Sequence, residues 1–344
     1  MSESRSARLR VIAALAVVFL FTGGVHQLRS GVRSAPDFLC STEFVSDVTI
    51  EIAKGATGSD IALQLYEAGV IKSSTAFFRL AVADKRSAMI APGAHIISKE
   101  ICAADALGQL LDPKRIAGLI NIIEGAWSSE IFKSMVVAGF EQSDIKSAIS
   151  QIELPTGFKS LEGLLFPAQY SFAKGTSADE ALQSMVDRGV TELSKSGVTN
   201  SSGKYNAQQL VTMASIIQAE GNTQDFSKIS RVIRNRLEKG MPLQMDSTVH
   251  FVKKVRGKIF LSTESTLLKS DYNTYRKYGL PPGPIGNPGF DALFASANPS
   301  AGDWIYFITV APGDTRFTQS NDQFSSWKIE YKKNLRAGVF GSSK

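Results

Sequence analysis

The sequence predicts an α+β protein made of an N-terminal transmembrane helix, a small α/β subdomain and a larger mixed α/β domain. An uncharged apolar run lies near the N-terminus, and segments with strand-like alternation and with helical periodicity follow one another in the remaining chain. Of the 344 residues, 43% are hydrophobic and 20% are charged, which is the composition of a folded protein with a real core. A chain of this length has room for about two domains and a tail.

The apolar run near the N-terminus has the features of a signal-anchor. Three arginines precede a run without charged residues; they are Arg5, Arg8 and Arg10, and the run is Val11–Val25. With its flanks, the run is long enough to span a bilayer. We expect a cytoplasmic tail at 1–10, an uncleaved transmembrane helix at 11–28, a polar linker at 29–46 and an exported body. A cleaved signal peptide is the alternative, although no A-x-A cleavage signal follows the run.

The cysteines, histidines and charges exclude some classes of protein. Cys40 and Cys102 lie far apart and match no metal-binding spacing, the histidines are dispersed, and no HExxH motif is present. We therefore expect no metal and no cofactor. In an oxidising compartment the two cysteines can form a disulfide, and two free thiols are the alternative. The net charge of +6 fits contact with an acidic polymer or a membrane surface, and without a long basic run it does not indicate nucleic-acid binding.

The small subdomain is expected at 47–113, with the element order βααβα. Its strands alternate in polarity, and its helices are bounded by Ser, Gly or Asp-Pro. The elements are a strand at Val48–Ile52, a helix at Asp60–Ala68, a helix from Ser74 to about Val82, a strand near His95–Ser98 and a helix at Ala103–Leu111.

The larger domain is expected at 114–335 and contains segments of both types. The predicted elements are a strand at Leu119–Ile123, a helix at Ser128–Ala138, a helix at Gln208–Gly221, a basic helix at Arg231–Gly240, an extended segment at Met241–Phe251 and a hairpin formed by Trp304–Val310 and Arg316–Gln319. The segment Ser270–Gly289 combines tyrosines with a loop rich in proline and glycine. Such stiff loops with aromatic and amide side chains suit sugars, and a purely structural loop is the alternative.

One helix carries a carboxylate where its pattern requires a hydrophobic residue. Apolar residues at Leu210, Met213 and Ile217 follow helical spacing, and the next position on the same stripe is Glu220. Burial and the negative end of the helix dipole both favour the protonated carboxyl, which is the form that a general acid needs. An ion pair between Glu220 and an arginine of the 231–236 segment is the alternative.

Several motifs in order resemble the endolytic murein transglycosylases of the YceG-like family. They are LEGLLFPAQYSF, LVTMASIIQAEG, NRLEKGMPLQMDSTV, YNTYRKYGLPPGPIGNPG and ALFASANPS, and the similarity runs from about Val48 to Phe317. The resemblance implies a LysM-like subdomain at 47–113, a catalytic domain at 114–335 and one N-terminal helix in the bacterial inner membrane. It also implies peptidoglycan glycan strands as the substrate and peptidoglycan synthases as further partners.

The resemblance assigns roles to individual residues. Glu220 matches the catalytic glutamate of the family. Substrate-binding positions are matched by Glu162, Gln244, Asp246, Thr248, Asn273, Tyr275, Pro282 and Gly283. The implied reaction cleaves the bond between N-acetylmuramic acid and N-acetylglucosamine and leaves a 1,6-anhydro end, with Glu220 acting first as acid and then as base.

The chain departs from the family pattern at several positions. Gln218 stands where the family often has glutamate, and Ser247 where it usually has proline. Thr315 and Phe324 occupy two histidine positions, and this loss favours the anchor among the two alternatives that remain. The chain can be a wall-binding anchor without activity, or a hydrolase that uses Asp246 as a second carboxylate.

Overall fold

The computed structural model describes residues 35–40, 46–198, 204–256 and 261–340. The chain forms two compact units, the first ending at Ala117 and the second beginning at Gly118, whereas the sequence placed the boundary after Pro113. The expected cytoplasmic tail and transmembrane helix at 1–28 lie outside the described residues. Within the described ranges, no helix is long and apolar enough to cross a membrane.

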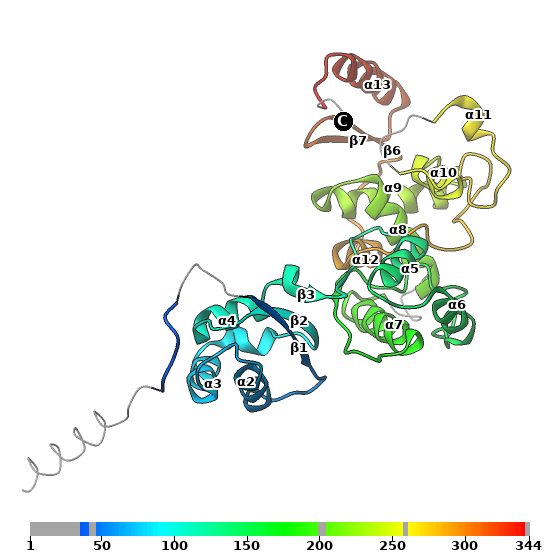
Figure 1. Ribbon diagram of the computed structural model, residues 1–344. Helices are drawn as coiled ribbons and strands as arrows, with labels where there is room; N and C mark the ends of the chain where they lie inside the picture. The colour runs from blue at the N-terminus through cyan, green and yellow to red at the C-terminus, as the bar shows by residue number, and fades with distance from the viewer. Residues whose placement is uncertain (1–34, 41–45, 199–203, 257–260, 341–344) are drawn as a thin grey trace, which may run out of the picture. The chain divides into compact units, whose positions relative to one another are not determined.

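The first unit is a small antiparallel sheet with helices packed against it (Figure 1). Its elements are β1 (Asp47–Ile52), α2 (Gly58–Glu67), α3 (Ser74–Ala83), β2 (Gly93–Ser98), α4 (Ala103–Leu110) and β3 (Ile116–Ala117). The strand order is β1-β2-β3, and both pairings are antiparallel. The expected order βααβα is therefore confirmed, and β3 extends the sheet.

Local sequence explains where the helices of this unit begin. Thr57 Oγ1 accepts the N–H of Asp60 at 3.2 Å, and Asp60 Oδ2 accepts the N–H of Thr57 at 2.8 Å, which forms a capping box before α2. Ser73 caps α3 in a similar way. The core contains fully buried side chains from both sheet and helices, among them Leu65, Phe77, Ile97, Leu107 and Leu110.

A disulfide joins Cys40 to Cys102, which decides between the two alternatives that the sequence left open. Close to it, the carboxylate of Asp37 accepts the backbone N–H of Ala103 at 3.1 Å, at the first residue of α4. The segment 35–40 is thus attached to α4 by one covalent and one polar contact.

Removing this bond is expected to destabilise the first unit. The cysteines are 62 positions apart, and closing a loop of that size in the unfolded chain is worth about 4 kcal/mol in the chain-entropy model, with about 2–4 kcal/mol typical of measured cases. Cys40→Ser should therefore lower the midpoint of thermal unfolding. Exported wild-type protein should migrate faster without reductant than with it, and a count of two free thiols would contradict the bond.

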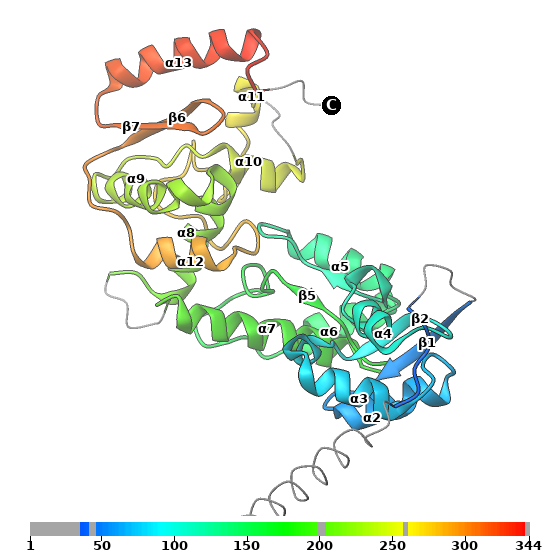
Figure 2. The same ribbon diagram turned by 90° about the vertical axis from the view of Figure 1, so that its left-hand side faces the viewer.

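The second unit contains most of the helices and two small two-stranded sheets (Figure 2). Its strands are β4 (Ile120–Asn121), β5 (Gln169–Tyr170), β6 (Tyr306–Ala311) and β7 (Asp314–Thr318), paired as β4-β5 and β6-β7. Its helices are α5 (Ser128–Val137), α6 (Gln142–Gln151), α7 (Ala178–Lys195), α8 (Ala207–Glu220), α9 (Phe226–Glu238), α10 (Asp246–Lys253), α11 (Thr263–Thr266), α12 (Phe290–Ala297) and α13 (Asn321–Arg336).

Helix α8 lies in the core of this unit. Asn206 caps its N-terminus, and every residue from Leu210 to Ile217 is buried. It contacts α9, α10 and α12. The β6-β7 hairpin lies between α9 and α13 (Figure 2), with β6 in contact with both helices. The helix that carries Glu220 is therefore held on several sides.

Two predicted elements differ from the structure. The basic helix expected at Arg231–Gly240 begins earlier, at Phe226, because Phe226 and Ile229 continue its buried face. The extended segment expected at Met241–Phe251 ends at Met245, and Asp246 begins α10. Leu243 and Met245 are buried in alternation, which explains the strand-like pattern before the helix.

Candidate active site

Glu220 is the last residue of α8, and its side chain is partly buried. Its Oε1 accepts the backbone N–H of Ser247 at 3.2 Å, from the first turn of α10. The next residue, Gly221, has extended backbone, so it does not end the helix by a left-handed conformation. A Cβ at this position would lie 2.2 Å from Cδ1 of Ile229, so a larger residue would require the buried Ile229 side chain of α9 to move.

The surroundings of Glu220 favour its protonated form. Burial raises the pKa of the Glu220 carboxyl above its ordinary value, and the charge of Asp246 raises it further. Ser247 and the charge of His250 act in the opposite direction without cancelling the effect. The position at the C-terminal end of α8 also disfavours an anion. A carboxyl in this state can donate a proton near neutral pH.

The ion pair considered as the alternative role of Glu220 is not formed. Within the described residues, no arginine forms a salt bridge with Glu220. Arg236 is buried, and its guanidinium donates to the carbonyl oxygens of Leu243 and Ile305. Sequence reasoning missed this residue. Its function is to fix the segment that leads into α10, and thereby Ser247.

Asp246 and Tyr275 form the polar group beside Glu220. Asp246 is the first residue of α10, and its Oδ1 accepts a hydrogen bond from the hydroxyl of Tyr275. Burial raises the pKa of Tyr275, and its hydrogen bond to Asp246 adds to this, so the hydroxyl remains a donor. The structure thus brings together Glu220, Asp246 and Tyr275 from three segments.

Three other predicted residues of this region have different surroundings. Gln244 is exposed, with a left-handed backbone (φ 52°). Thr248 is fully buried, and its hydroxyl is hydrogen-bonded to Met245 O and Thr274 Oγ1. Asn273 is fully buried, and its Nδ2 donates to the carbonyl oxygens of Thr266 and Leu268. The last two side chains offer no free polar atom to a ligand, so a direct contact with substrate does not fit them; they hold the loop that carries Tyr275.

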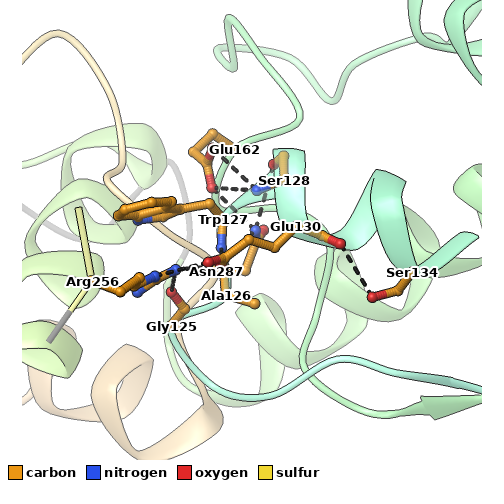
Figure 3. A network of polar contacts seen from close by, with 9 residues as sticks. All are labelled: Gly125, Ala126, Trp127, Ser128, Glu130, Ser134, Glu162, Arg256 and Asn287. Carbon is orange, nitrogen blue, oxygen red and sulfur yellow. Dashed lines mark hydrogen bonds and ion pairs between the residues drawn. The ribbon is translucent and has the colours of Figure 1, made fainter. Parts of the chain in front are cut away.

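Glu162 belongs to a second polar network, which Figure 3 shows. Its carboxylate accepts the backbone N–H of Ser128 at 3.1 Å, at the first residue of α5, and Nδ2 of Asn287 at 3.2 Å. Burial raises the pKa of Glu162 to about 7, although Ser128 and the charges of Lys254 and Arg256 lower it. Burial thus brings the pKa of this carboxyl close to neutral pH.

Asn287 is the centre of this network, and sequence reasoning missed it. The side chain is fully buried. Its Oδ1 accepts the backbone N–H groups of Gly163 and Leu165 at 2.9 Å each, and its Nδ2 donates to Ala126 O at 2.9 Å. One amide thus joins segments that are more than a hundred positions apart. The signal in the sequence was its position between Gly286 and Pro288 in the stiff loop, where a polar side chain can bind neighbouring backbone groups.

Pro282 and Gly283 lie in the same loop as Asn287. The carbonyl oxygen of Pro282 accepts Nε2 of Gln208 at 2.9 Å, at the beginning of α8. A Cβ at Gly283 would lie 3.2 Å from the hydroxyl of Tyr272, and the charge of Glu162 acts on that same hydroxyl. This loop therefore extends from the N-terminal part of α8 to the Glu162 network.

The positions that depart from the family pattern also have defined contacts. Gln218 Oε1 accepts the N–H of Gly289 at 3.0 Å. Thr315 Oγ1 lies 3.0 Å from Thr309 Oγ1, across the β6-β7 hairpin. Phe324 stacks on Tyr306 with 4.9 Å between ring centroids, and Tyr306 in turn lies 5.5 Å from the guanidinium of Arg236. Gln218 thus holds the end of the stiff loop, whereas Thr315 and Phe324 support the β6-β7 hairpin.

The second unit is thus a helical scaffold that presents a partly buried glutamic acid with a raised pKa at the C-terminal end of α8. Residues 50–329 match the YceG-like family, and the chain belongs to that family. The family that the sequence motifs indicated is confirmed.

Solved and curated relatives agree with this assignment. A protein of Bacillus subtilis (strain 168) named endolytic murein transglycosylase is 30% identical over 309 residues, which cover 83% of this chain and 84% of that protein. A protein of the same name from Streptococcus pneumoniae (strain D39) is 28% identical over 315 residues, and the match covers 80% of this chain but only 56% of the longer pneumococcal protein. The crystal structure of a yceG-like protein from Listeria monocytogenes aligns with a TM-score of 0.55 at 27% identity, over 82% of this chain and 99% of that chain.

The hydrogen bond from Ser247 to Glu220 predicts the effect of a proline at this position. Ser247→Pro removes the N–H that lowers the pKa of Glu220, while the first turn of a helix tolerates proline. The pKa of Glu220 should therefore rise further, and the decline in rate at alkaline pH should move to higher pH. The pH dependence of kcat/KM measures this shift.

Ser247→Ala is the matched control because it keeps the N–H and removes only the hydroxyl. The Ser247 hydroxyl also lowers the pKa of Glu220, so its removal alone should move the alkaline limb upward. Ser247→Ala should therefore shift this limb less than Ser247→Pro does, and an equal shift in both variants would contradict the role of the N–H.

Proposed function

We propose that this chain is an endolytic murein transglycosylase that cleaves peptidoglycan glycan strands between N-acetylmuramic acid and N-acetylglucosamine. The observation that carries the proposal is the state of Glu220, a carboxyl at a helix C-terminus whose pKa is raised by burial. The family and the names of the B. subtilis and S. pneumoniae relatives support the substrate.

The proposed reaction needs one carboxyl in two protonation states. Protonated Glu220 donates its proton to the glycosidic oxygen, and the bond from that oxygen to C1 of the muramic acid breaks. The carboxylate left on Glu220 then takes the proton of the C6 hydroxyl of the same sugar, and O6 forms a bond to C1. The product is a 1,6-anhydro ring, and Glu220 is again protonated. The nucleophile belongs to the substrate, so no water has to be positioned.

Asp246 has a positioning role in this scheme. Its carboxylate is occupied by the hydroxyl of Tyr275, and its charge helps to keep Glu220 protonated. A hydrolase would need a second carboxylate free to activate water or to attack the sugar. The Tyr275 contact therefore supports the single-carboxyl mechanism.

The proposed location is the bacterial inner membrane, with residues 11–28 as a single-pass anchor and both folded units on the extracytoplasmic side. The disulfide between Cys40 and Cys102 supports export, because such bonds persist in oxidising compartments. The first unit, with two helices between antiparallel strands, is proposed to be LysM-like and to contact the glycan. Peptidoglycan synthases are proposed as partners because they produce the strands that are cut.

Mass spectrometry of the products from purified glycan strands tests the function. We expect new ends that carry 1,6-anhydro-N-acetylmuramic acid. Ends with a reducing muramic acid would instead indicate a hydrolase. Strands that bind to the protein and remain uncut at high enzyme concentration would indicate a wall-binding anchor.

A further inference from the structure

A pocket of about 470 Å³ lies at the N-terminal end of α8, at the opposite end of this helix from Glu220. The first-turn residues of α8, the loop at Pro281 and Pro282, and segments near positions 157–159 and 204–206 line it. The same loop continues to Gly283 and Asn287, so the pocket borders the segments of the candidate active site. Nothing in the reaction proposed above uses this pocket.

The charges around the pocket favour an anion. Lys159 and Lys204 are exposed side chains of its lining, and none of the described lining residues carries a carboxylate. The N-terminus of α8 adds the positive end of a helix dipole. The carboxylate that acts on the adjacent Tyr205 is Glu238, and Arg234 offsets it, with its guanidinium 4.9 Å from the Tyr205 ring centroid.

Two buried polar atoms in the lining lack a partner within the described part of the chain. Tyr205 is 7% exposed, and its hydroxyl makes no hydrogen bond. Gln208 is fixed by its Nε2 contact with Pro282 O, and its Oε1 has no donor. Buried polar groups are nearly always paired in folded proteins, so an unpaired donor and an unpaired acceptor beside two lysines indicate a ligand that supplies both. A sugar bearing a carboxylate supplies a hydroxyl or amide donor and an anionic acceptor.

We propose that this pocket is a second glycan subsite, which binds a carboxylate-bearing sugar of the strand at a distance of roughly 20 Å from Glu220, from the rise of 1.5 Å per residue along α8. The subsite rests on the proposed function, since it takes another part of the same polymer. Because a short strand cannot reach both ends of α8, a second subsite would make the protein bind long strands more tightly than short ones.

Binding of intact strands to a Glu220→Gln background tests the subsite without cleavage. Lys159→Ser with Lys204→Ser should raise the Kd for long strands by about threefold to tenfold at low salt, and the difference should shrink at high salt. The control is Lys146→Ser with Lys332→Ser, which removes two exposed lysines elsewhere on the second unit. Equal Kd values for the two double variants would overturn the proposal.

Tyr205→Phe gives a second readout that a structural role would not produce. The hydroxyl has no partner in the free protein, so its removal should not lower the midpoint of thermal unfolding, while the Kd should rise. A lower unfolding midpoint with an unchanged Kd would contradict its role in binding. Strands with and without stem peptides identify the carboxylate, because the carboxyl of the muramic acid is an amide wherever a peptide is attached. A loss of affinity confined to peptide-bearing strands assigns the carboxylate to the peptide, and a loss confined to strands without peptides assigns it to the muramic acid.

The experiments distinguish an error in the subsite proposal from an error in the proposed function. If only the subsite is wrong, the lysine variants bind like the control pair, and wild-type protein still cuts strands through Glu220. If the function is wrong, wild-type protein leaves the strands uncut.

Discussion

Replacing Glu220 with glutamine is expected to lower the rate of strand cleavage by at least 10²–10⁴-fold, the usual contribution of general acid–base catalysis. Glutamine has nearly the same shape, so the packing at the end of α8 should persist. It can neither donate a proton to the glycosidic oxygen nor take one from the C6 hydroxyl. Binding of strands should remain, because the surrounding groups are unchanged. The measurement is the initial rate of new end formation.

The stability of this variant has an expected sign. The pKa of Glu220 is raised in the folded state, so ionising the carboxyl costs more in the folded than in the unfolded chain. This cost is absent at pH values below the pKa of Glu220 in the unfolded chain. It is fully present above the pKa of Glu220 in the folded protein. Glu220→Gln should therefore match wild type in acid and be equally stable or more stable at neutral and alkaline pH. Glu153→Gln, at an exposed glutamate of the same unit, is the control for both measurements. A Glu220→Gln variant that folds and cuts at the wild-type rate would falsify the mechanism.

Replacing Asn287 with alanine is expected to lower the stability of the second unit strongly. The change leaves the buried N–H groups of Gly163 and Leu165 and the carbonyl of Ala126 without this side chain. Each buried polar group without a partner costs about 1–3 kcal/mol, so the free energy of unfolding should fall by more than about 3 kcal/mol. Chemical denaturation measures this loss.

Activity should fall together with stability, because Asn287 also fixes Glu162 and the loop that contains Pro282. Asn298→Ala is the control, since the Asn298 amide makes one exposed contact, with Phe294 O. If Asn287→Ala lowers the free energy of unfolding no more than Asn298→Ala does, water replaces the Asn287 amide and the prediction is contradicted.

Local patterns in the sequence were sufficient for the elements that define the site. The apolar stripe of Leu210, Met213 and Ile217 predicted both α8 and the place of Glu220 on it. Alternation and capping residues predicted the sheet and helices of the first unit. These features depend on neighbours within a few positions, which a single sequence displays.

The residues that sequence reasoning missed depend on distant contacts. Asn287 holds Gly163, which is 124 positions away, and no local pattern indicates that contact. Arg236 looks like one more basic residue of a solvated helix, yet it is buried against Ile305 O, which is 69 positions away. Thr248 is the opposite case. Its hydroxyl lies in a family motif and was predicted to bind substrate, but it is buried and donates to Met245 O.

Infrared difference titration of Glu220 observes the proton on the proposed acid itself. The spectrum of Glu220→Gln is subtracted from that of wild type at each pH, so that Glu162, which also titrates near neutral pH, cancels. The account predicts a protonated carboxyl band that belongs to Glu220 and disappears with a midpoint clearly above the ordinary glutamate pKa of about 4.3. A midpoint at or below that value would mean that Glu220 is ionised at neutral pH and cannot start the reaction as the acid.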